Sequence, residues 1–151
     1  MQKAKVLFVC SANLDRSPTA EKLFHNWKGR WEAKSAGIMP SLGRNPLSQD
    51  LIDWADLILV MEPQHAEYIH ANFNTNPNKL RVLDVSNRFV HDDPELILEL
   101  RTRVTPILEI VDRLAKVEHL QKTRAMKLYS QILRQIDQFT CIKMEKRAHY
   151  V

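Results

Sequence analysis

The sequence predicts a three-layer α/β fold, in which a parallel sheet of about four strands carries helices on both faces. Apolar runs of strand length alternate with longer stretches whose apolar residues recur at helical spacing. The apolar runs are continuous, which is typical of parallel strands buried on both faces. The length of 151 residues, with 44% hydrophobic and 26% charged residues, suits a soluble protein with a single core.

The order of elements follows from these patterns and from the turn residues between them. Strands are expected at residues 6–10, 31–36, 57–61 and 80–85. Helices are expected at residues 18–29 and 48–54 and from residue 63 onward. Pro18 and Pro63 suit a first helical turn, and Ser48 suits a helix cap. Residues 37–46 and 74–78 are rich in proline, glycine and asparagine, which favours loops.

The C-terminal third is predicted to be helical. Beyond Pro94, one apolar face is formed by Leu96, Leu100, Val104, Leu108, Val111 and Leu114. Pro106 is expected to kink or break this helix. A second helical stretch carries Leu128, Ile132, Ile136 and Phe139 on one face. We expect this face to pack against the domain or against another copy in a homodimer.

Charge divides the chain into two regions. Residues 1–118 carry 15 Lys and Arg against 16 Asp and Glu, whereas residues 119–151 carry seven against two. We therefore expect a near-neutral domain at residues 1–118 and a basic helical extension at 119–151. A tail that binds nucleic acid or an acidic membrane is the alternative. The interleaving of its basic and apolar residues favours a solvated helix face and argues against that alternative.

Composition also limits the compartment and the cofactors. Two cysteines provide no disulfide framework, which suits a reducing cytoplasm. The apolar run near the N-terminus is about four residues long, too short for a signal peptide or a membrane span. The sequence shows neither zinc-ligand spacing nor a glycine-rich dinucleotide loop. We expect no metal and no organic cofactor.

The segment from Cys10 to Ser17 carries the chemistry. An apolar strand ends at Cys10, and Arg16 and Ser17 lead into a helix. Backbone N–H groups of such a loop can cradle an anion, and Arg16 can clamp two of its oxygens. Cys10 would then face phosphorus as a thiolate, with the Ser17 hydroxyl donating a hydrogen bond to it. Asn13 suits the left-handed backbone that this loop needs. The alternative is a buried strand-end cysteine and a solvated arginine.

These residues resemble the opening of the low-molecular-weight protein tyrosine phosphatases, and are closest to a short bacterial branch of predicted phosphatases. The resemblance covers about residues 4–115. It rests on the segments 6–10, 16–21, 35–37 and 55–61, together with Asn13 and the pair Asp93-Pro94. It implies a phosphate-binding loop after the first strand, with Cys10 and Arg16 as catalytic residues. The substrate phosphate would be bound by Ser11, Ala12, Asn13, Leu14, Asp15, Arg16 and Ser17.

The resemblance also places Asp93 on a loop over the site, as the general acid. Pro94 would fix the backbone beside it, and the carboxyl would give a proton to the leaving phenolate. The alternative is that residues 92–95 are only an acidic start of a helix. Asp92 is the substitute if the loop is shifted by one residue.

Three departures from the family place a preference for phosphotyrosine in question. Asp15 stands where many members have a second cysteine, so their protective disulfide cannot form here. Glu95-Leu96 replace aromatic residues that flank the substrate ring in many members. The loop from Gly37 to Pro46 also lacks the usual aromatic, although a bound ring needs stacking partners. The candidate substitutes are Phe89, Tyr68 and Leu14. Alternatively, Arg44, Asn45 and His91 could line a polar site.

The remaining reactive residues show no pattern of a site. We interpret His25, His65, His70, His119 and His149 as surface residues, because they show no ligand spacing. Cys141 is expected to be structural. The tryptophans Trp27, Trp31 and Trp54 are expected to be core or half-buried.

The sequence thus predicts a cysteine-dependent phosphatase that hydrolyses phosphotyrosine or an aryl phosphate through a phosphocysteine. Phosphate, vanadate and arsenate should inhibit it as anion mimics. One alternative is arsenate reduction, which usually needs two further cysteines as a relay, and only Cys141 is available. The other alternative is a phosphate-binding regulatory module without turnover, which Asp15 and the missing aromatic residues would favour.

Overall fold

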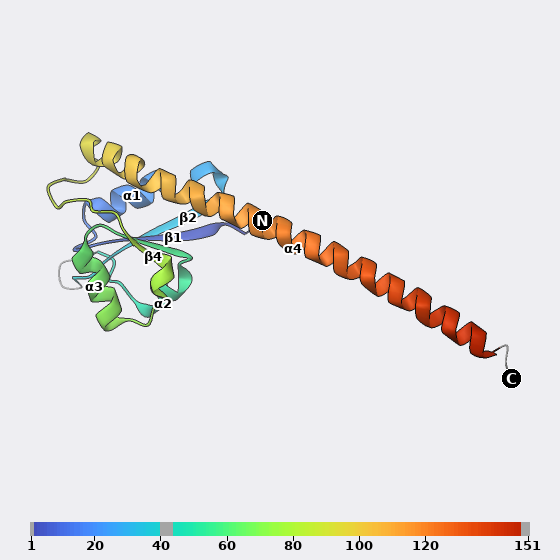
Figure 1. Cartoon of the computed structure of the whole chain (residues 1–151). Coiled ribbons are helices and arrows are strands. Elements are labelled where there is room, and N and C mark those ends of the chain that lie inside the picture. Colours follow the sequence, from blue (N-terminus) through green and yellow to red (C-terminus); the bar gives the residue numbers. More distant parts are fainter. Residues whose placement is uncertain (1, 40–43, 149–151) are drawn as a thin grey trace. The chain divides into compact units, whose positions relative to one another are not determined.

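The computed structural model describes residues 2–39 and 44–148 of the chain (Figure 1). The chain forms two compact units, residues 1–106 and residues 107–151. In the first unit four strands form one sheet in the order β2-β1-β3-β4, and all neighbouring strands are parallel. The strands are β1 (Ala4–Cys10), β2 (Trp31–Gly37), β3 (Leu57–Val60) and β4 (Leu80–Val82). The predicted parallel sheet is therefore confirmed.

Helices cover both faces of this sheet. They are α1 (Arg16–Phe24), α2 (Gln49–Trp54), α3 (Pro63–Asn72) and, within the first unit, the start of α4 (Pro94–Ala148). Short 3-10 turns are η1 (Trp27–Gly29) and η2 (Pro77–Lys79). As predicted, Ser48 caps α2, because its hydroxyl accepts a hydrogen bond from the Leu51 N–H at 3.3 Å. Pro63 opens α3, where its fixed backbone angle suits the first turn.

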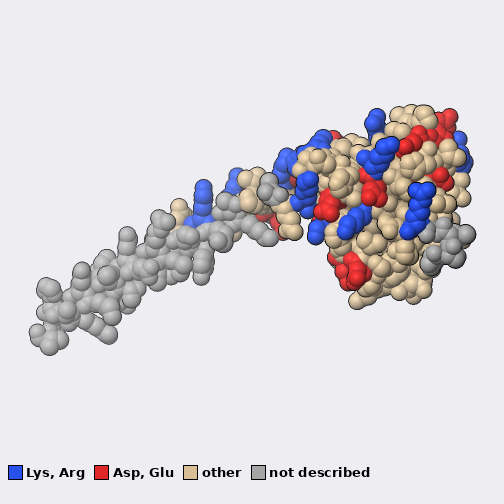
Figure 2. All heavy atoms as spheres, turned by 180° about the vertical axis from the view of Figure 1, so that it is seen from behind, with Lys and Arg blue, Asp and Glu red and all other residues tan. Residues whose placement is uncertain are grey.

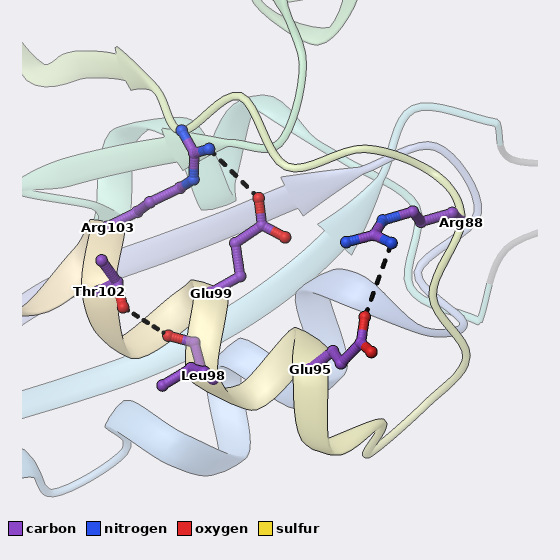
Figure 3. A pocket seen from close by; sticks show the side chains of 6 residues that line it. All are labelled: Arg88, Glu95, Leu98, Glu99, Thr102 and Arg103. Atoms are coloured by element: carbon purple, nitrogen blue, oxygen red, sulfur yellow. Dashed lines mark hydrogen bonds and ion pairs between the residues drawn. The ribbon is translucent and has the colours of Figure 1, made fainter.

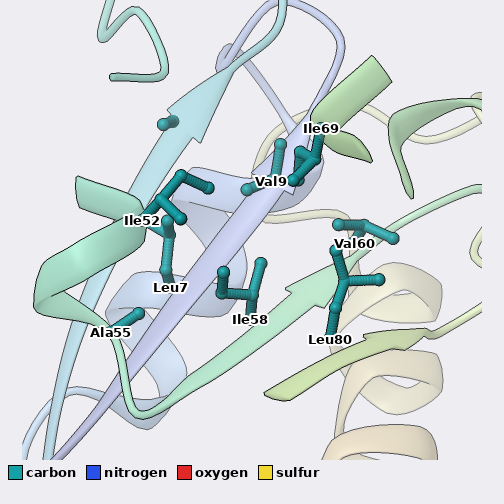
Figure 4. Packing of buried hydrophobic residues seen from close by; sticks show 9 residues of the cluster. Leu7, Val9, Ile52, Ala55, Ile58, Val60, Ile69 and Leu80 are labelled. Atoms are coloured by element: carbon teal, nitrogen blue, oxygen red, sulfur yellow. The ribbon is translucent and has the colours of Figure 1, made fainter. Parts of the chain in front are cut away.

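The alternation of side chains along β1 divides the core between the two faces. Leu7 and Val9 point toward α2 and α3, where they pack with Ile52 and Ile69 (Figure 4). Phe8 points to the opposite face and lies 5.8 Å from Phe24 of α1 between ring centroids. Each such buried side chain contributes roughly 1.5–3 kcal/mol relative to an exposed one. Burial on both faces explains why β1 is continuously apolar, and it places Cys10 at the carboxyl edge of an inner strand.

Three predicted boundaries differ from the structure. The first helix ends at Phe24 instead of continuing to Gly29, because Asn26 and Lys28 adopt positive φ angles of 62° and 48°. Strand β4 ends at Val82, and Asp84 at φ 61° has left the extended region. A kink or a break was predicted at Pro106; α4 is one continuous helix through it, so the break is wrong. An interior proline removes one backbone hydrogen bond, and the remainder of this helix continues without it.

The second unit consists of the rest of α4 within the described residues. Leu128 and Ile132 are 59% and 46% exposed. The side chains of Ile136 and Phe139 lie outside the described residues, as do those of Cys141 and His149. The predicted packing of this apolar face, and the boundary at residue 118, stay predictions.

The surface of the first unit carries both signs of charge. Lysine and arginine side chains lie interspersed with aspartate and glutamate on the face seen in Figure 2. This mixture agrees with the near-neutral balance of residues 1–118 in the sequence. No helix in the described ranges is both long and apolar enough to cross a membrane.

Candidate active site

The loop between β1 and α1 forms the floor of the site. β1 ends at Cys10 and α1 begins at Arg16. Asn13 has φ 55°, so the predicted left-handed position is confirmed. Among the described residues, no backbone N–H from Ser11 to Asp15 donates a hydrogen bond to a protein acceptor. Free N–H groups in a loop that enters a helix N-terminus form a site that favours an anion.

Cys10 is held by a buried hydrogen-bond chain behind this loop. Its Sγ lies 2.9 Å from the Ser17 Oγ, and the Asn13 Nδ2 donates to the same Oγ at 2.9 Å. Because Ser17 accepts from Asn13, its own hydrogen is free to point toward sulfur or toward the Ala36 carbonyl at 3.4 Å. The sulfur is the nearer of the two acceptors. This order of donors suits a thiolate acceptor, as expected from the sequence.

Arg16 is buried, and one of its nitrogens is fixed by two acceptors. Its Nη1 forms an ion pair with Glu62 Oε1 and donates to the Val85 carbonyl at 2.8 Å. In the described part of the chain both contacts use Nη1, which leaves Nε and Nη2 for an oxyanion. A guanidinium that is fixed in this way can clamp two oxygens with little further loss of side-chain entropy.

His65 corrects the prediction that it lies on the surface, because its side chain is fully buried. Its Nδ1 accepts from the Glu62 N–H at 3.0 Å, so the proton of the neutral ring lies on Nε2. Nε2 is 2.9 Å from the Ser11 Oγ and donates to it. Burial and the nearby positive charge of Arg16 lower the pKa of His65 to about 4, which keeps the ring neutral.

Glu62 and His65 were both missed as site residues. A signal was present in the sequence, since Glu62 follows the buried run 57–61 directly. β3 lies beside β1 in the sheet, so residues just beyond its carboxyl end reach the loop after Cys10. The sequence alone does not show that these two strands are neighbours.

Gly37 is required where β2 passes the loop. A Cβ added there would lie 2.8 Å from the Ser11 carbonyl oxygen and 2.9 Å from the Asn13 backbone nitrogen. Main-chain hydrogen bonds from Ile38 to Cys10 and from Met39 to Ser11 continue this close approach. Because Gly37 has no side chain, the end of β2 can pack directly against the backbone of the loop.

A cavity of about 270 Å³ opens in front of Cys10. Its lining residues are Cys10, Ser11, Ala12, Leu14, Asp15, Arg16, Met39 and Asn87. The structure thus brings together most of the predicted loop residues, whereas Asn13 and Ser17 lie buried behind it. Met39 and Asn87 come from loops after β2 and β4, and no sequence pattern pointed to either.

The two candidate acids lie at the start of α4. Asp93 Oδ1 accepts from the Glu95 N–H at 2.9 Å, which is the contact of a helix cap, and Asp93 is not among the described residues that line the cavity. Asp92 pairs with Lys22 at 2.8 Å and lies 3.3 Å from His91 Nδ1. The hydrogen bond from Lys22 lowers the pKa of Asp92, so Asp92 stays ionised and is a poor proton donor.

Three residues were suggested as substitutes for the missing aromatic residues. Among the described residues, Phe89 and Tyr68 do not line the cavity, whereas Leu14 lines it and contributes apolar surface. Phe89 is buried, with the Arg88 guanidinium 4.4 Å from its ring centroid. Tyr68 packs on Phe73, with ring centroids 6.3 Å apart. Arg44, Asn45 and His91 are exposed and lie outside the described cavity lining.

A larger hollow of about 550 Å³ lies elsewhere on the first unit (Figure 3). Its two arginines are already paired, Arg88 with Glu95 at 3.6 Å and Arg103 with Glu99 at 3.2 Å. The described lining of this hollow includes no cysteine or other nucleophile comparable to Cys10 in the smaller cavity. The smaller cavity at Cys10 is therefore the candidate active site.

Comparison with known proteins agrees with this geometry. The profile of the low molecular weight phosphotyrosine protein phosphatases matches residues 5–46, which include the loop and β2. A protein-arginine-phosphatase of Bacillus subtilis (strain 168) is 29% identical over 103 residues, covering 52% of this chain and 69% of that protein. The chain is thus similar to the low molecular weight phosphotyrosine protein phosphatases.

Solved structures of this family share the fold. The YwlE arginine phosphatase from Geobacillus stearothermophilus superposes with a TM-score of 0.58 at 23% identity, covering 78% of this chain and 96% of that one. Wzb from Escherichia coli K30, a tyrosine phosphatase in complex with phosphate, gives a TM-score of 0.57 at 20% identity, covering 72% and 98%. A YwlE mutant from Bacillus subtilis gives 0.53 at 26% identity, covering 71% and 99%.

Proposed function

We propose that the protein is a phosphatase that hydrolyses phosphomonoesters through a phosphocysteine on Cys10, and that its substrates are phosphotyrosine or aryl phosphates. The observation that carries the proposal is the buried Cys10–Ser17 contact at 2.9 Å beside Arg16. It lies beneath a loop whose backbone N–H groups donate to no protein acceptor among the described residues. This arrangement joins a nucleophile to donors for the oxygens of a phosphate.

In the first step the Cys10 thiolate attacks phosphorus. A sulfur–phosphorus bond forms as the bond from phosphorus to the leaving oxygen breaks. Asp93 gives its proton to that oxygen, so the alcohol or phenol leaves in neutral form. Arg16 and the loop N–H groups hold the three equatorial oxygens while their charge redistributes.

In the second step water attacks the phosphocysteine. The Asp93 carboxylate takes a proton from the water as the sulfur–phosphorus bond breaks. Inorganic phosphate is released and the Cys10 thiolate is regenerated. Glu62 balances the charge of Arg16 throughout, and His65 supports Ser11 in the loop. Neither step uses a metal or an organic cofactor.

Phosphoarginine is a second candidate substrate, and two observations favour it. One relative that matches this chain is a protein-arginine-phosphatase. The described lining of the cavity holds no aromatic side chain to stack on a tyrosine ring, while it does hold the carboxylate of Asp15. A carboxylate at the cavity wall would attract a guanidinium leaving group.

Turnover of p-nitrophenyl phosphate by the purified chain tests this proposal. We expect hydrolysis by the parent and none by Cys10→Ser, which should still bind vanadate. Arg16→Lys should be severely impaired, because a point charge cannot replace a bidentate fork. Binding of phosphate without turnover in the parent would support a regulatory module instead. Sustained arsenate reduction coupled to a thiol reductant would support the reductase alternative.

The choice between substrates needs a direct competition. Phosphotyrosine and phosphoarginine peptides of otherwise identical sequence would be compared by their kcat/KM values. Phosphate, vanadate and arsenate should inhibit both reactions competitively. The proposal also assigns the enzyme to the cytoplasm, where a reduced Cys10 is maintained.

A further inference from the structure

The segment that carries Asp93 is fastened to α1 and to Asp15, the residue directly before it. Four hydrogen bonds join the two. Arg16 Nη1 donates to the Val85 carbonyl at 2.8 Å, and the His91 N–H donates to Asp15 Oδ1 at 2.8 Å. Asp92 makes the other two: its N–H donates to Thr19 Oγ1 at 3.1 Å, and its Oδ2 accepts from Lys22 Nζ at 2.8 Å. All four lie within the first unit. The segment after β4 is thus bonded at both of its ends to α1 and to the loop that follows Cys10.

Asp15 occupies a particular place among these contacts. It is the last loop residue before α1, it lines the cavity, and it reaches across to a main-chain N–H only two residues before Asp93. Asp93 itself is fixed on its other side by the hydrogen bond of its carboxylate to the Glu95 N–H. A loss of the Asp15 contact would therefore free the His91 N–H, two residues before Asp93.

We propose that Asp15 is a positioning residue that acts through Asp93. Its carboxylate holds the main chain at His91, and thereby sets where the general acid stands relative to Cys10. This proposal rests on the proposed function. Asp15 stands where many members of the family have a cysteine, and a thiol is a far weaker acceptor for an N–H than a carboxylate. The Asp15 carboxylate therefore brings negative charge to the cavity wall, and the same carboxylate holds the His91 N–H.

The backbone is left-handed at Asp92, next to the residue that Asp15 holds. Asp92 has φ 58°, a left-handed value that is uncommon outside glycine. The neighbouring contacts to Thr19 and Lys22 hold Asp92 in that conformation, and the Asp15 contact fixes the residue before it. A residue in a sparsely populated conformation persists only where its surroundings determine it.

Two substitutions separate the effect of the His91–Asp15 hydrogen bond, here called the tether, from the effect of the negative charge of Asp15. Asp15→Ala removes both the acceptor and the negative charge. Asp15→Asn keeps an acceptor oxygen but removes the charge, so it should strengthen phosphate binding and weaken the tether less. Glu67→Ala provides a control, since it removes an exposed carboxylate from α3 at a position outside the site. Each variant would be made in the full chain and in the Asp93→Asn background.

The readout is the dependence of kcat on the leaving group, together with amide hydrogen exchange at His91. Asp15→Ala should lower kcat for phenyl phosphate about tenfold or more relative to p-nitrophenyl phosphate, because only the poorer leaving group needs the proton. It should cause no further loss in the Asp93→Asn background. Exchange at the His91 N–H should accelerate in Asp15→Ala, less in Asp15→Asn, and not in Glu67→Ala.

An equal loss for both substrates, or a full additional loss in the Asp93→Asn background, would overturn the proposal. Unchanged exchange at His91 in Asp15→Ala would overturn the tether itself. A parent chain without turnover would overturn the proposed function and, with it, the role assigned to Asp15. In that case accelerated exchange would still establish the tether, so the two failures are distinguishable.

Discussion

His65 Nε2 lies 2.9 Å from the Ser11 hydroxyl, and this contact joins the start of α3 to the loop that follows Cys10. The ring is buried, and its other nitrogen accepts from the Glu62 N–H. Glu62 in turn pairs with Arg16. One side chain of α3 therefore orders both the loop and, through its neighbour, the arginine that would clamp phosphate.

This burial predicts a pH-dependent stability. The pKa of His65 falls from 6.5 to about 4 on folding, so the unfolded chain binds more protons between these pH values. The free energy of unfolding should therefore decrease as pH falls from about 6.5 to 4, by at most about 3 kcal/mol from this group, and less with solvent screening. Urea denaturation at a series of pH values measures the slope.

Two variants of His65 serve as matched tests. His65→Gln can still donate to Ser11, and His65→Asn can still accept from the Glu62 N–H. Both remove the titrating group, so both should flatten the stability profile over this pH range relative to the parent. A slope that is equal in parent and variants would show that His65 does not titrate with folding.

Gly37→Ala should damage the site more than a usual glycine substitution. The added methyl group would meet the backbone of Ser11 and Asn13 at distances below 3 Å, and that backbone belongs to the phosphate loop. We expect reduced phosphate affinity and a destabilisation of roughly 1–3 kcal/mol. Isothermal titration with phosphate and thermal denaturation measure the two effects. Gly29→Ala is the control, since an added methyl group there would meet no atom within 4 Å, although the φ of 68° adds strain without touching the loop.

Asp93→Asn should reduce kcat most for substrates with poor leaving groups. Only these need a proton as they depart, and a general acid typically contributes roughly 10²–10⁴-fold in rate. A series of aryl phosphates of graded leaving-group acidity measures the slope. Asp92→Asn is the matched control, because Lys22 keeps Asp92 ionised. If Asp92→Asn alone shows the steeper slope, then the acid is Asp92.

Truncation after Glu118 tests the C-terminal extension. The apolar face at Leu128, Ile132, Ile136 and Phe139 predicts packing against the domain or against another copy. The truncated chain should then melt at a lower temperature or have a lower oligomeric mass, and it should retain most of its p-nitrophenyl phosphate turnover. An unchanged melting temperature and mass, with lost binding to DNA or anionic vesicles, would favour a basic binding tail.

Local patterns predicted the sheet and the loop well. The continuous apolar runs located all four strands, because a parallel strand buried on both faces needs apolar residues throughout. Asn13 could be assigned a left-handed backbone, because its short polar side chain tolerates that conformation. Cys10 and Arg16 could be placed at the two ends of one loop from the sequence, since that loop is local in sequence.

The parts of the site that were missed depend on tertiary contacts. His65 has no ligand pattern in the sequence, and its burial follows only from the adjacency of β3 and β1. Glu62, Met39 and Asn87 reach the site from three other segments. The contact of Asp15 with the His91 N–H spans 76 residues of sequence, so no local pattern could show that this carboxylate holds a distant loop.

The most direct test of the mechanism is to trap its intermediate. Asp93→Asn would be mixed with p-nitrophenyl phosphate, quenched in acid and analysed by peptide mass spectrometry. A good leaving group allows the first step, while the loss of the base slows hydrolysis of the intermediate. The account predicts one phosphate group on the peptide that contains Cys10, and none when Cys10→Ser is added. Phosphate on another residue, or rapid turnover with no labelled Cys10 peptide, would contradict it.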